Sequence, residues 1–532
     1  LDVRSPAVGP GPGGGGEIVY TVGPELHLLD LSTGEDRKVE VRIPGARPKL
    51  RSQRVDVSDA VEHASVAPGG ARIVVEARGD IWTLPAEHGT PRNLTRSSGV
   101  AERYPSWSPD GRWIAFFSDR SGEYELHVVE SDGGGEERQV TSGHETFFYP
   151  PVWSPDSERL VFQEKTGDLW LCTLASGELE RIATDPWAAT RPEERRTVAF
   201  SPDSRWIALD LTEPAGESIR SLWLYDTSGA KLHRVTSELA DDALPVFSRD
   251  GEHLYFVARR AYEPTYSEVE FAWAFENTQV LMAMPLRADI ERPFAARSDE
   301  VCWDEEGDGE SEEPAEDGDA PPPVEIELDG LQRRAYRLPV PPGAFGALDV
   351  TDEGLLVYLR RAGGGSDEPR VLLLDPTDEE GEEKTVVSGV GEITLSPDGG
   401  TVAGRGNGGG LPSLYATEPD AEATDPVSEG MLARVDPRAE WEQVFHDSWR
   451  LFRDFFYDPG MHGIDWAAVR DRYAAMLPDC ASRHDVTWVI REMIGELNVG
   501  HARYSGPPDD SGSGPGVGLL GVDFEQIGRA HV

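Results

Sequence analysis

The amino-acid sequence predicts a mainly β protein in which a seven-bladed β-propeller is followed by a small α-helical subdomain. Two observations predict this fold. A turn motif recurs about every 46 residues, and the apolar period changes from two to 3.6 residues after Asp436. The chain has 532 residues, including 57 Gly and 41 Pro, so it is long enough for several cores and rich in turns.

The turn motif has five positions: an apolar residue, then Ser, then Pro or Arg, then Asp, and finally Gly or Ser. Its clear copies begin at Trp107, Trp153, Phe200, Phe247 and Leu395. The first four of these are separated by 46, 47 and 47 residues. Weaker copies begin at Val66 and Val350, which gives seven copies in all.

Each copy has the composition of a tight turn between two strands. Pro presets the backbone for the turn, and Asp followed by Gly or Ser closes it. Strand-like segments follow the copy at Trp107, at 113–117, 126–129 and 139–141. One period therefore supplies three or four strands, the size of a propeller blade. The repeated acidic residues favour turn hydrogen bonding over catalysis; they are Asp110, Asp156, Asp203, Asp250 and Asp398.

The interval of 103 residues between Phe247 and Val350 is longer than one period. An insertion is one explanation, because residues 304–323 are acidic and rich in Pro and Gly, as is typical of a disordered loop. A degenerate eighth blade is the other. We expect the propeller to span residues 46–430, and residues 1–45, with strand patterns at 17–20 and 26–30, to be the remnant of an upstream propeller blade.

After Asp436 the sequence predicts three helices in a subdomain that spans residues 431–505. The first ends near Tyr457, Asp465 caps the second, and Ser482 with Asp485 forms a capping box that opens the third. The apolar stripes consist of Trp441, Val444, Phe445, Trp449 and Phe452, of Trp466, Val469, Tyr473 and Met476, and of Val486, Val489, Ile490, Met493, Ile494 and Leu497. We expect a turn at 498–501 and a strand at 502–504 to follow.

The charge balance excludes several partners. Asp and Glu number 97 and Lys and Arg number 50, so the net charge of −47 repels nucleic acid and anionic membranes. Lys is nearly absent, which fits either a high-salt cytoplasm or a GC-rich genome. We expect no nucleic-acid or membrane partner.

The sequence predicts neither a disulfide framework nor a cofactor or metal site. Cys172, Cys302 and Cys480 are odd in number and widely spaced, which favours a reducing compartment and a cytoplasmic location. No run of about 18 apolar residues indicates a membrane span. The pairs His446 with Asp447 and His484 with Asp485 lack metal-ligand spacing, so we interpret them as structural.

Three segments in order resemble the tricorn protease family. Residues 71–82 look like the opening of its seven-bladed propeller, and 441–504 like the first catalytic subdomain of this serine peptidase. Residues 506–526 would be a linker and the start of a PDZ domain, with 518–524 carrying the resemblance. The resemblance implies oligopeptide substrates, a propeller that acts as substrate gate or channel, and a homo-hexamer. Residues 527–532 instead resemble translated sequencing-adapter read-through, and we exclude them, with His531, from functional interpretation.

The resemblance places the general base of the family on His501, which would take a proton from the nucleophile and return it to the leaving amine. Gly500 stands where the family type has a Ser. The nucleophilic Ser and a supporting Glu belong to a second catalytic subdomain outside this sequence, so we expect the chain by itself to be inactive.

Two other functions remain open at this point. The propeller repeats also resemble those of Tol-type modules, which are non-enzymatic scaffolds that bind a protein partner. Alternatively, the helical segment could belong to a relative of the C-terminal processing peptidases, which use a Ser-Lys pair. No G-x-S-x-G motif occurs, which counts against a prolyl-oligopeptidase arrangement.

Overall fold

The computed structural model describes residues 3–42, 47–185, 187, 197–214, 216–267, 272–291, 323–361, 368–406 and 409–506. The chain divides into two compact units. The larger unit comprises Arg54–Arg434 and Arg450–Tyr457, and the smaller comprises Leu1–Gln53, Val435–Trp449 and Asp458–Val532. None of the described helices is long and apolar enough to span a bilayer.

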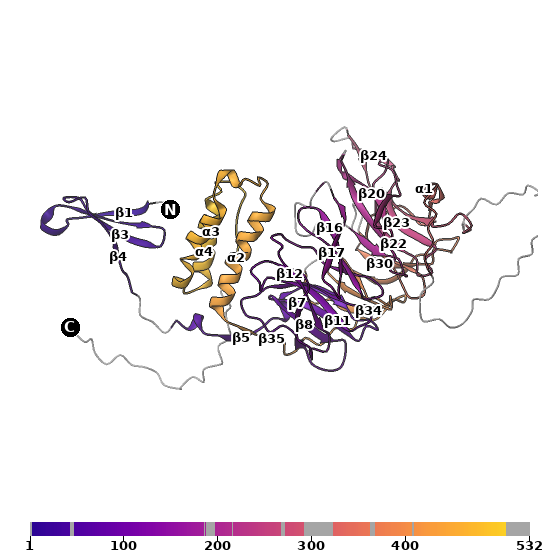
Figure 1. Cartoon of the computed structure of the whole chain (residues 1–532), viewed down its shortest axis with the longest axis horizontal. Coiled ribbons are helices and arrows are strands. Elements are labelled where there is room, and N and C mark those ends of the chain that lie inside the picture. The colour runs from indigo at the N-terminus through magenta and orange to yellow at the C-terminus, as the bar shows by residue number, and fades with distance from the viewer. Residues whose placement is uncertain are drawn as a thin grey trace, which may run out of the picture. The chain divides into compact units, whose positions relative to one another are not determined.

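In the described residues of the larger unit, seven antiparallel sheets form the blades, six of four strands and one of three, and two further sheets have two strands each (Figure 1). The first three sheets consist of β6 (Val61–Val66), β7 (Arg72–Ala77), β8 (Asp80–Pro85) and β9 (Arg92–Asn93); β10 (Glu102–Trp107), β11 (Trp113–Ser118), β12 (Glu125–Glu130) and β13 (Arg138–Gln139); and β14 (Val152–Trp153), β15 (Arg159–Gln163), β16 (Asp168–Thr173) and β17 (Glu178–Thr184). The next three consist of β18 (Val198–Phe200), β19 (Trp206–Glu213), β20 (Gly216–Asp226) and β21 (Lys231–Arg234); β22 (Asp242–Phe247), β23 (His253–Arg259), β26 (Gln279–Pro285) and β27 (Tyr336–Arg337); and β28 (Phe345–Val350), β29 (Leu356–Arg360), β30 (Arg370–Leu374) and β31 (Lys384–Ser388). The seventh consists of β32 (Glu392–Leu395), β33 (Thr401–Arg405) and β34 (Ser413–Ala416).

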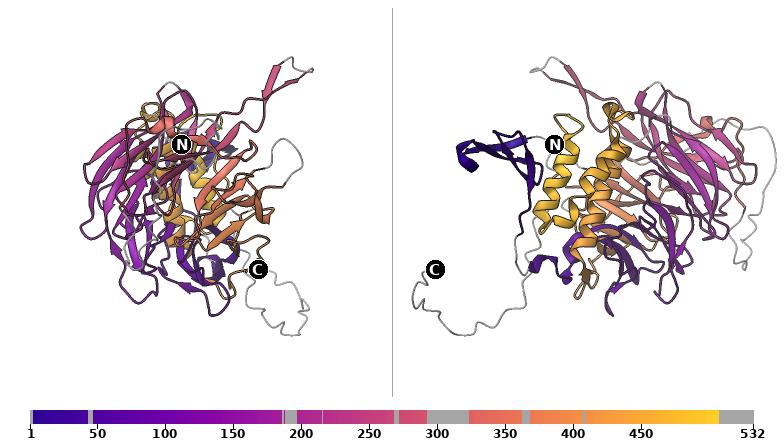
Figure 2. Two further views of the ribbon diagram at one scale, coloured as in Figure 1. Left: turned by 90° about the vertical axis from the view of Figure 1, so that its right-hand side faces the viewer. Right: turned by 60° about the vertical axis from the view of Figure 1, so that its left-hand side comes forward.

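The seven sheets close into a ring (Figure 2). The first strand of each sheet contacts the first strand of the next, and β32 contacts β6 to complete the circuit. Hydrogen bonds also join the two ends: Gly69 N–H donates to Asp398 Oδ2 at 2.6 Å, and Arg405 Nη1 donates to the Glu62 carbonyl at 2.6 Å. The short strands β5 (Gln53–Asp56) and β35 (Leu432–Val435), where the chain enters and leaves the ring, pair with each other. The predicted seven-bladed propeller is confirmed.

The hydrophobic core lies between neighbouring sheets. Phe117 of the second sheet stacks on Phe148, with ring centroids 4.7 Å apart, and meets Phe162 of the third sheet edge to face. Similar clusters join each later pair of sheets, for example Trp206 with Phe256 and Tyr255 with Tyr358. Each blade therefore buries both of its faces against its neighbours, which explains the continuous buried runs of the middle strands.

The repeated turn motif does the structural work predicted for it. In the second blade, Ser108 Oγ donates to Asp110 Oδ1 at 2.5 Å and accepts the Trp113 N–H at 2.8 Å. The same pair of bonds recurs in the third, fourth and fifth blades. The turns also link blades, because Asp110 N–H donates to Ser157 Oγ of the next blade at 3.0 Å.

The long interval after Phe247 is an insertion within the fifth blade. Among the described residues, 248–344 complete one sheet and add the hairpin of β24 (Pro264–Ser267) and β25 (Ala272–Phe275) and the short helix α1 (Leu331–Arg334). No further sheet of three or four strands forms in this described part, so these residues add no eighth blade. The predicted acidic loop at 304–323 lies outside the described residues except for Pro323.

The smaller unit contains a four-stranded antiparallel sheet and helices. The sheet consists of β1 (Val3–Gly9), β2 (Glu17–Val22), β3 (Glu25–Asp30) and β4 (Asp36–Val39). The helices are α2 (Pro437–Phe455), whose last turns belong to the larger unit, α3 (Trp466–Ala474) and α4 (Arg483–Gly495). Asp465 caps α3 by accepting the Ala468 N–H at 2.9 Å, and Ser482 with Asp485 forms the predicted capping box.

One sequence expectation is wrong. The strand predicted at 502–504 does not form, and residues 502–506 have no regular structure. No neighbouring strand pairs with this segment in the described part of the unit. Instead, Arg491 Nε of α4 donates to the Tyr504 carbonyl at 2.9 Å, so the segment is bound to a helix rather than to a sheet.

Candidate functional site: the propeller cavity and the turn after helix α4

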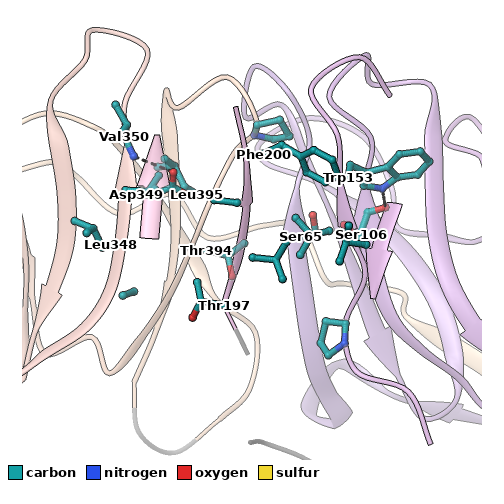
Figure 3. Close-up of a pocket in the computed structure, with 18 of the residues that line it drawn as sticks. Ser65, Ser106, Trp153, Thr197, Phe200, Leu348, Asp349, Val350, Thr394 and Leu395 are labelled. Atoms are coloured by element: carbon teal, nitrogen blue, oxygen red, sulfur yellow. Dashed lines mark hydrogen bonds between the residues drawn. The ribbon is translucent and has the colours of Figure 1, made fainter. Parts of the chain in front are cut away.

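The propeller ring encloses a central cavity of about 630 Å³. Its wall includes residues from the first strand of all seven sheets (Figure 3). In every repeat, the residue immediately before the first residue of the turn motif lines the cavity. These seven residues, here called the wall ring, are Ser65, Ser106, Val152, Ala199, Val246, Asp349 and Thr394. One repeat position therefore supplies the cavity wall.

The wall is mainly apolar and hydroxylic. Trp153, Phe200 and Leu395 contribute apolar surface, while the hydroxyl groups of the wall ring and Thr197 are polar and uncharged. The charged lining residues are Arg220, Arg249 and Asp349. Asp349 is the acidic member of the wall ring, and its carboxylate accepts the Val350 N–H at 2.8 Å.

A second cavity of about 300 Å³ adjoins the first, since both are lined by Ser65, Ser106, Pro150, Pro151, Ile393 and Thr394. The additional wall of this second cavity includes His63, Tyr104 and Arg405. The two cavities together extend the space within the ring.

The inner strand edges are interrupted where they face this space. Tyr104 and Leu244 have φ values of 58° and 54°, each precedes a Pro, and the strand register shifts at both places. Pro150 and Pro151 occupy the corresponding region before β14. Pro lacks an N–H, and bulges twist a strand edge, so both features oppose pairing with a further strand. The wall is therefore poorly suited to hold a peptide by strand addition.

His501 lies on the turn after α4 and is exposed. Two side chains hold the chain just before it: His462 Nδ1 lies 3.1 Å from the Leu497 carbonyl, and Tyr473 donates to Glu496 at 2.8 Å. None of the described side chains hydrogen-bonds the His501 ring. A side chain at Gly500 would meet open space within 4 Å, so the Ser of the family pattern would fit there.

The other sequence candidates are structural. Asp485 Oδ2 accepts the N–H groups of Ala481 and Ser482 at 2.8 and 2.9 Å, which uses its carboxylate at the start of α4. Cys172 and Cys480 are free and buried, and burial raises the pKa of each thiol to about 11. Cys302 lies outside the described residues.

Asp250, Glu252 and His253 could approach a metal ion geometrically. Both carboxylates already have other partners. Asp250 accepts the Ser248 hydroxyl and the Glu252 N–H, and Glu252 lies 3.4 Å from Arg287. We assign no metal to this group.

Sequence reasoning missed the cavity wall and the carboxylate of Asp349, the one acidic group that the described residues contribute to the first cavity. The turn motif indicates where this carboxylate lies, because the residues immediately before its seven copies are Ser, Ser, Val, Ala, Val, Asp and Thr in chain order. The charge at Asp349 stands out only when the seven repeats are aligned and the preceding position is known to face the cavity.

A closed seven-bladed ring with a central cavity, followed along the chain by a set of helices, defines a multidomain propeller protein. Residues 61–407 match the family model of the tricorn protease second β-propeller domain, and residues 437–495 match that of the tricorn protease C1 domain. The chain belongs to the tricorn protease family.

Known proteins agree with this assignment. Tricorn protease homolog 1 of Streptomyces coelicolor is 27% identical over 532 residues, which cover 96% of this chain and 49% of that protein. Tricorn protease of Thermoplasma acidophilum is 24% identical over 459 residues, which cover 79% of this chain and 41% of that protein. The crystal structure of the tricorn protease superposes with a TM-score of 0.74 at 18% identity, covering 93% of this chain and 46% of that chain, and so has the same fold. This chain spans about half the length of these relatives.

Proposed function

We propose that this chain is the propeller and first catalytic subdomain of a tricorn-type serine peptidase that hydrolyses oligopeptides. In this proposal the propeller is the gate or channel through which a peptide passes. The observation that carries the proposal is the central cavity, to which all seven blades contribute the same repeat position. Membership of the tricorn protease family supports it.

The construction of the wall supports passage rather than permanent binding. A peptide in an extended conformation binds a sheet edge through a row of main-chain hydrogen bonds. At Tyr104-Pro105 and Leu244-Pro245, the left-handed residue and the Pro interrupt such a row. A peptide in this cavity would therefore contact mainly side chains, which allows it to move.

His501 is the proposed general base. An exposed imidazole on a turn can approach a hydroxyl that another segment supplies and can take up its proton. The contacts of His462 and Tyr473 with residues 496–497 limit the movement of the chain that leads to it. The nucleophilic Ser and supporting Glu would come from a second catalytic subdomain, so this chain alone would not hydrolyse peptides.

The remaining domain assignments belong to the same proposal. The sheet β1–β4 has the antiparallel order of a propeller blade, and the matched propeller model is named as the second one, which supports an upstream propeller blade at residues 1–45. Residues 506–526 would lead into a PDZ domain. The proposed assembly is a homo-hexamer in the cytoplasm, by resemblance to the family.

Substitution of His501 in the full-length peptidase tests the proposal. We expect His501→Ala to lower kcat for a short peptide by about 10² to 10⁴, the usual contribution of a positioned general base. His484→Ala is the matched control, because His484 is exposed on the same subdomain at the opposite end of α4 and should leave kcat unchanged.

Full activity of the His501→Ala enzyme would contradict the role of His501 and favour a Ser-Lys mechanism. Hydrolysis by the present chain alone at an ordinary rate would contradict the assignment of the nucleophile to another subdomain. A full-length protein that binds peptides but cleaves none would favour a scaffold function.

A further inference from the structure

One member of the wall ring differs in chemistry from the other six. Six positions carry Ser, Val, Ala or Thr, and the seventh is Asp349 on β28. Asp349 is opposite Val357 in the β28–β29 ladder, and its side chain lines the cavity. Figure 3 shows its one hydrogen bond within the cavity wall, the N–H of the adjacent Val350 at 2.8 Å. A carboxylate has acceptor sites for about four hydrogen bonds, and among the described residues the Val350 N–H fills one of them.

The two cationic residues of the cavity wall are engaged elsewhere. Arg220 Nε donates to Asp241 at 2.8 Å, and its Nη1 lies 3.3 Å from Asp210. Arg249 Nη2 donates to the Val350 carbonyl at 3.0 Å, and the same guanidinium reaches the carbonyls of Thr351 and Pro397 at 3.3 Å. Arg249 therefore anchors the turns below the cavity, and it acts on Asp349 only through space.

The surroundings of Asp349 favour a cationic ligand. Burial raises the pKa of this carboxyl, although the Val350 N–H and the charge of Arg249 act in the opposite direction. The wall therefore does not fully compensate the charge of Asp349. A cation that enters the cavity would replace the lost hydration of this carboxylate, and a charge-assisted hydrogen bond is stronger than one between neutral groups.

The size of the cavity is compatible with part of a peptide. Pockets for small ligands usually measure about 300 to 1,000 Å³ and combine apolar walls with a few polar groups. The cavity of about 630 Å³, with Phe200 and Leu395 among its apolar lining, has this character. Asp349 would then be the group that fixes one end of the occupant.

We propose that Asp349 binds the alkylammonium group of a peptide, either its N-terminal amine or a lysine side chain, inside the propeller cavity. This inference rests on the proposed passage of peptides through the cavity, and adds to it a preference for one chemical class. It predicts that a peptide engages the cavity wall with its cationic group rather than through strand pairing.

Binding of three peptides to the present chain tests the inference by calorimetry, without any need for catalysis. The probes are a pentapeptide of Ala and Leu with a free N-terminus, its N-acetylated form, and an N-acetylated form with one Lys. We expect the free peptide to bind at least about tenfold more tightly than the acetylated one, which is the effect of one charged hydrogen bond. The Lys form should recover binding if the side-chain ammonium can also reach Asp349.

Variants identify the group responsible. Asp349→Asn should abolish the tenfold difference, and Asp349→Glu should retain it. Asp352→Asn is the matched control, because this substitution removes the same charge from an exposed residue in the turn that follows β28. Asp352 similarly accepts the N–H of its following residue at 3.0 Å. It should leave the difference unchanged.

Equal affinity of the wild-type chain for the free and acetylated peptides would overturn the inference and leave the channel proposal intact. So would an undiminished preference in a folded Asp349→Asn chain. Failure of all three peptides to bind would overturn the inference and count against the channel itself, whereas the role of His501 would still be decided by its own activity assay.

Discussion

Arg450 and Asp119 form a buried ion pair within the larger unit, and substitution of Arg450 should strongly destabilise it. Only 6% and 4% of the two side chains are exposed. The guanidinium also donates to the Gly122 carbonyl at 2.6 Å and lies 5.1 Å from the centre of the Tyr124 ring. Asp119 Oδ1 accepts the Ala101 N–H at 2.8 Å. These contacts attach the last turns of α2 to the second propeller blade.

Arg450→Met keeps the apolar stem and removes the charge, so the buried carboxylate of Asp119 would lose its cationic partner and keep its hydrogen bond with the Ala101 N–H. Removal of one partner from a buried ion pair costs about 3–5 kcal/mol. Loss of the cation above the Tyr124 ring adds to this cost. In the double variant Arg450→Met with Asp119→Asn, neither charge is present, so no buried charge is left without its partner. The free energy of unfolding should therefore fall by at least about 1 kcal/mol less than the sum of the two single losses.

Urea unfolding and amide hydrogen exchange in β12 can measure these losses. The control is Arg181→Met, because Arg181 is 59% exposed and lies 3.2 Å from Asp168 in a surface pair. Such pairs contribute about 0–1 kcal/mol. A loss below about 1 kcal/mol for Arg450→Met, or strictly additive losses in the double variant, would refute the reasoning.

Two further predictions concern the ring itself. Burial raises the pKa of Glu102 from 4.5 to about 8, despite the hydrogen bond from Ser97, and the nearby Asp80 adds to the increase. The native state therefore loses stability as the pH rises towards 8. In urea unfolding, the free energy of unfolding of Glu102→Gln should increase by about 2–3 kcal/mol relative to that of the wild type between pH 6 and pH 8. A difference that stays constant with pH would contradict the raised pKa of Glu102. Asp398→Ala removes the charged hydrogen bond with Gly69 that joins the seventh blade to the first. It should lower the free energy of unfolding by about 2 kcal/mol and speed hydrogen exchange at Gly69. Unchanged exchange at Gly69 would show that this bond does not help to close the ring.

Local patterns explain why most elements could be predicted. The Ser-Pro-Asp turn depends on bonds between residues two and five apart, such as Ser108 with Asp110 and with Trp113. Helix caps are equally local, and the N-cap at Asp465 and the capping box at Ser482 lie at the predicted positions. Interactions of this range are visible in a sequence because the spacing itself determines the geometry.

Long-range contacts explain what could not be predicted. Arg450 meets Asp119 across 331 positions of the sequence, and no local pattern records such a pairing. The strand expected at 502–504 was wrong for a related reason: its composition allows a strand, but a strand requires a partner, and Arg491 of α4 binds this segment instead. The sequence indicated His501 only through resemblance, and its role remains a prediction.

In each repeat, the turn residues that join neighbouring blades directly follow a residue that lines the cavity. In each blade, the turn residues are used by hydrogen bonds that hold neighbouring blades together, as Asp110 and Ser157 show. The preceding residue faces the cavity, and Val152, Ala199 and Val246 have no polar side-chain atom that could make such a bond, whereas Ser65 Oγ accepts the Trp107 N–H of the next blade at 3.1 Å. A substitution at a position whose side chain makes no such bond changes the wall by one side chain and leaves the turn intact. These positions can therefore carry different chemistry at little structural cost, and Asp349 is the place where the wall ring carries a charge.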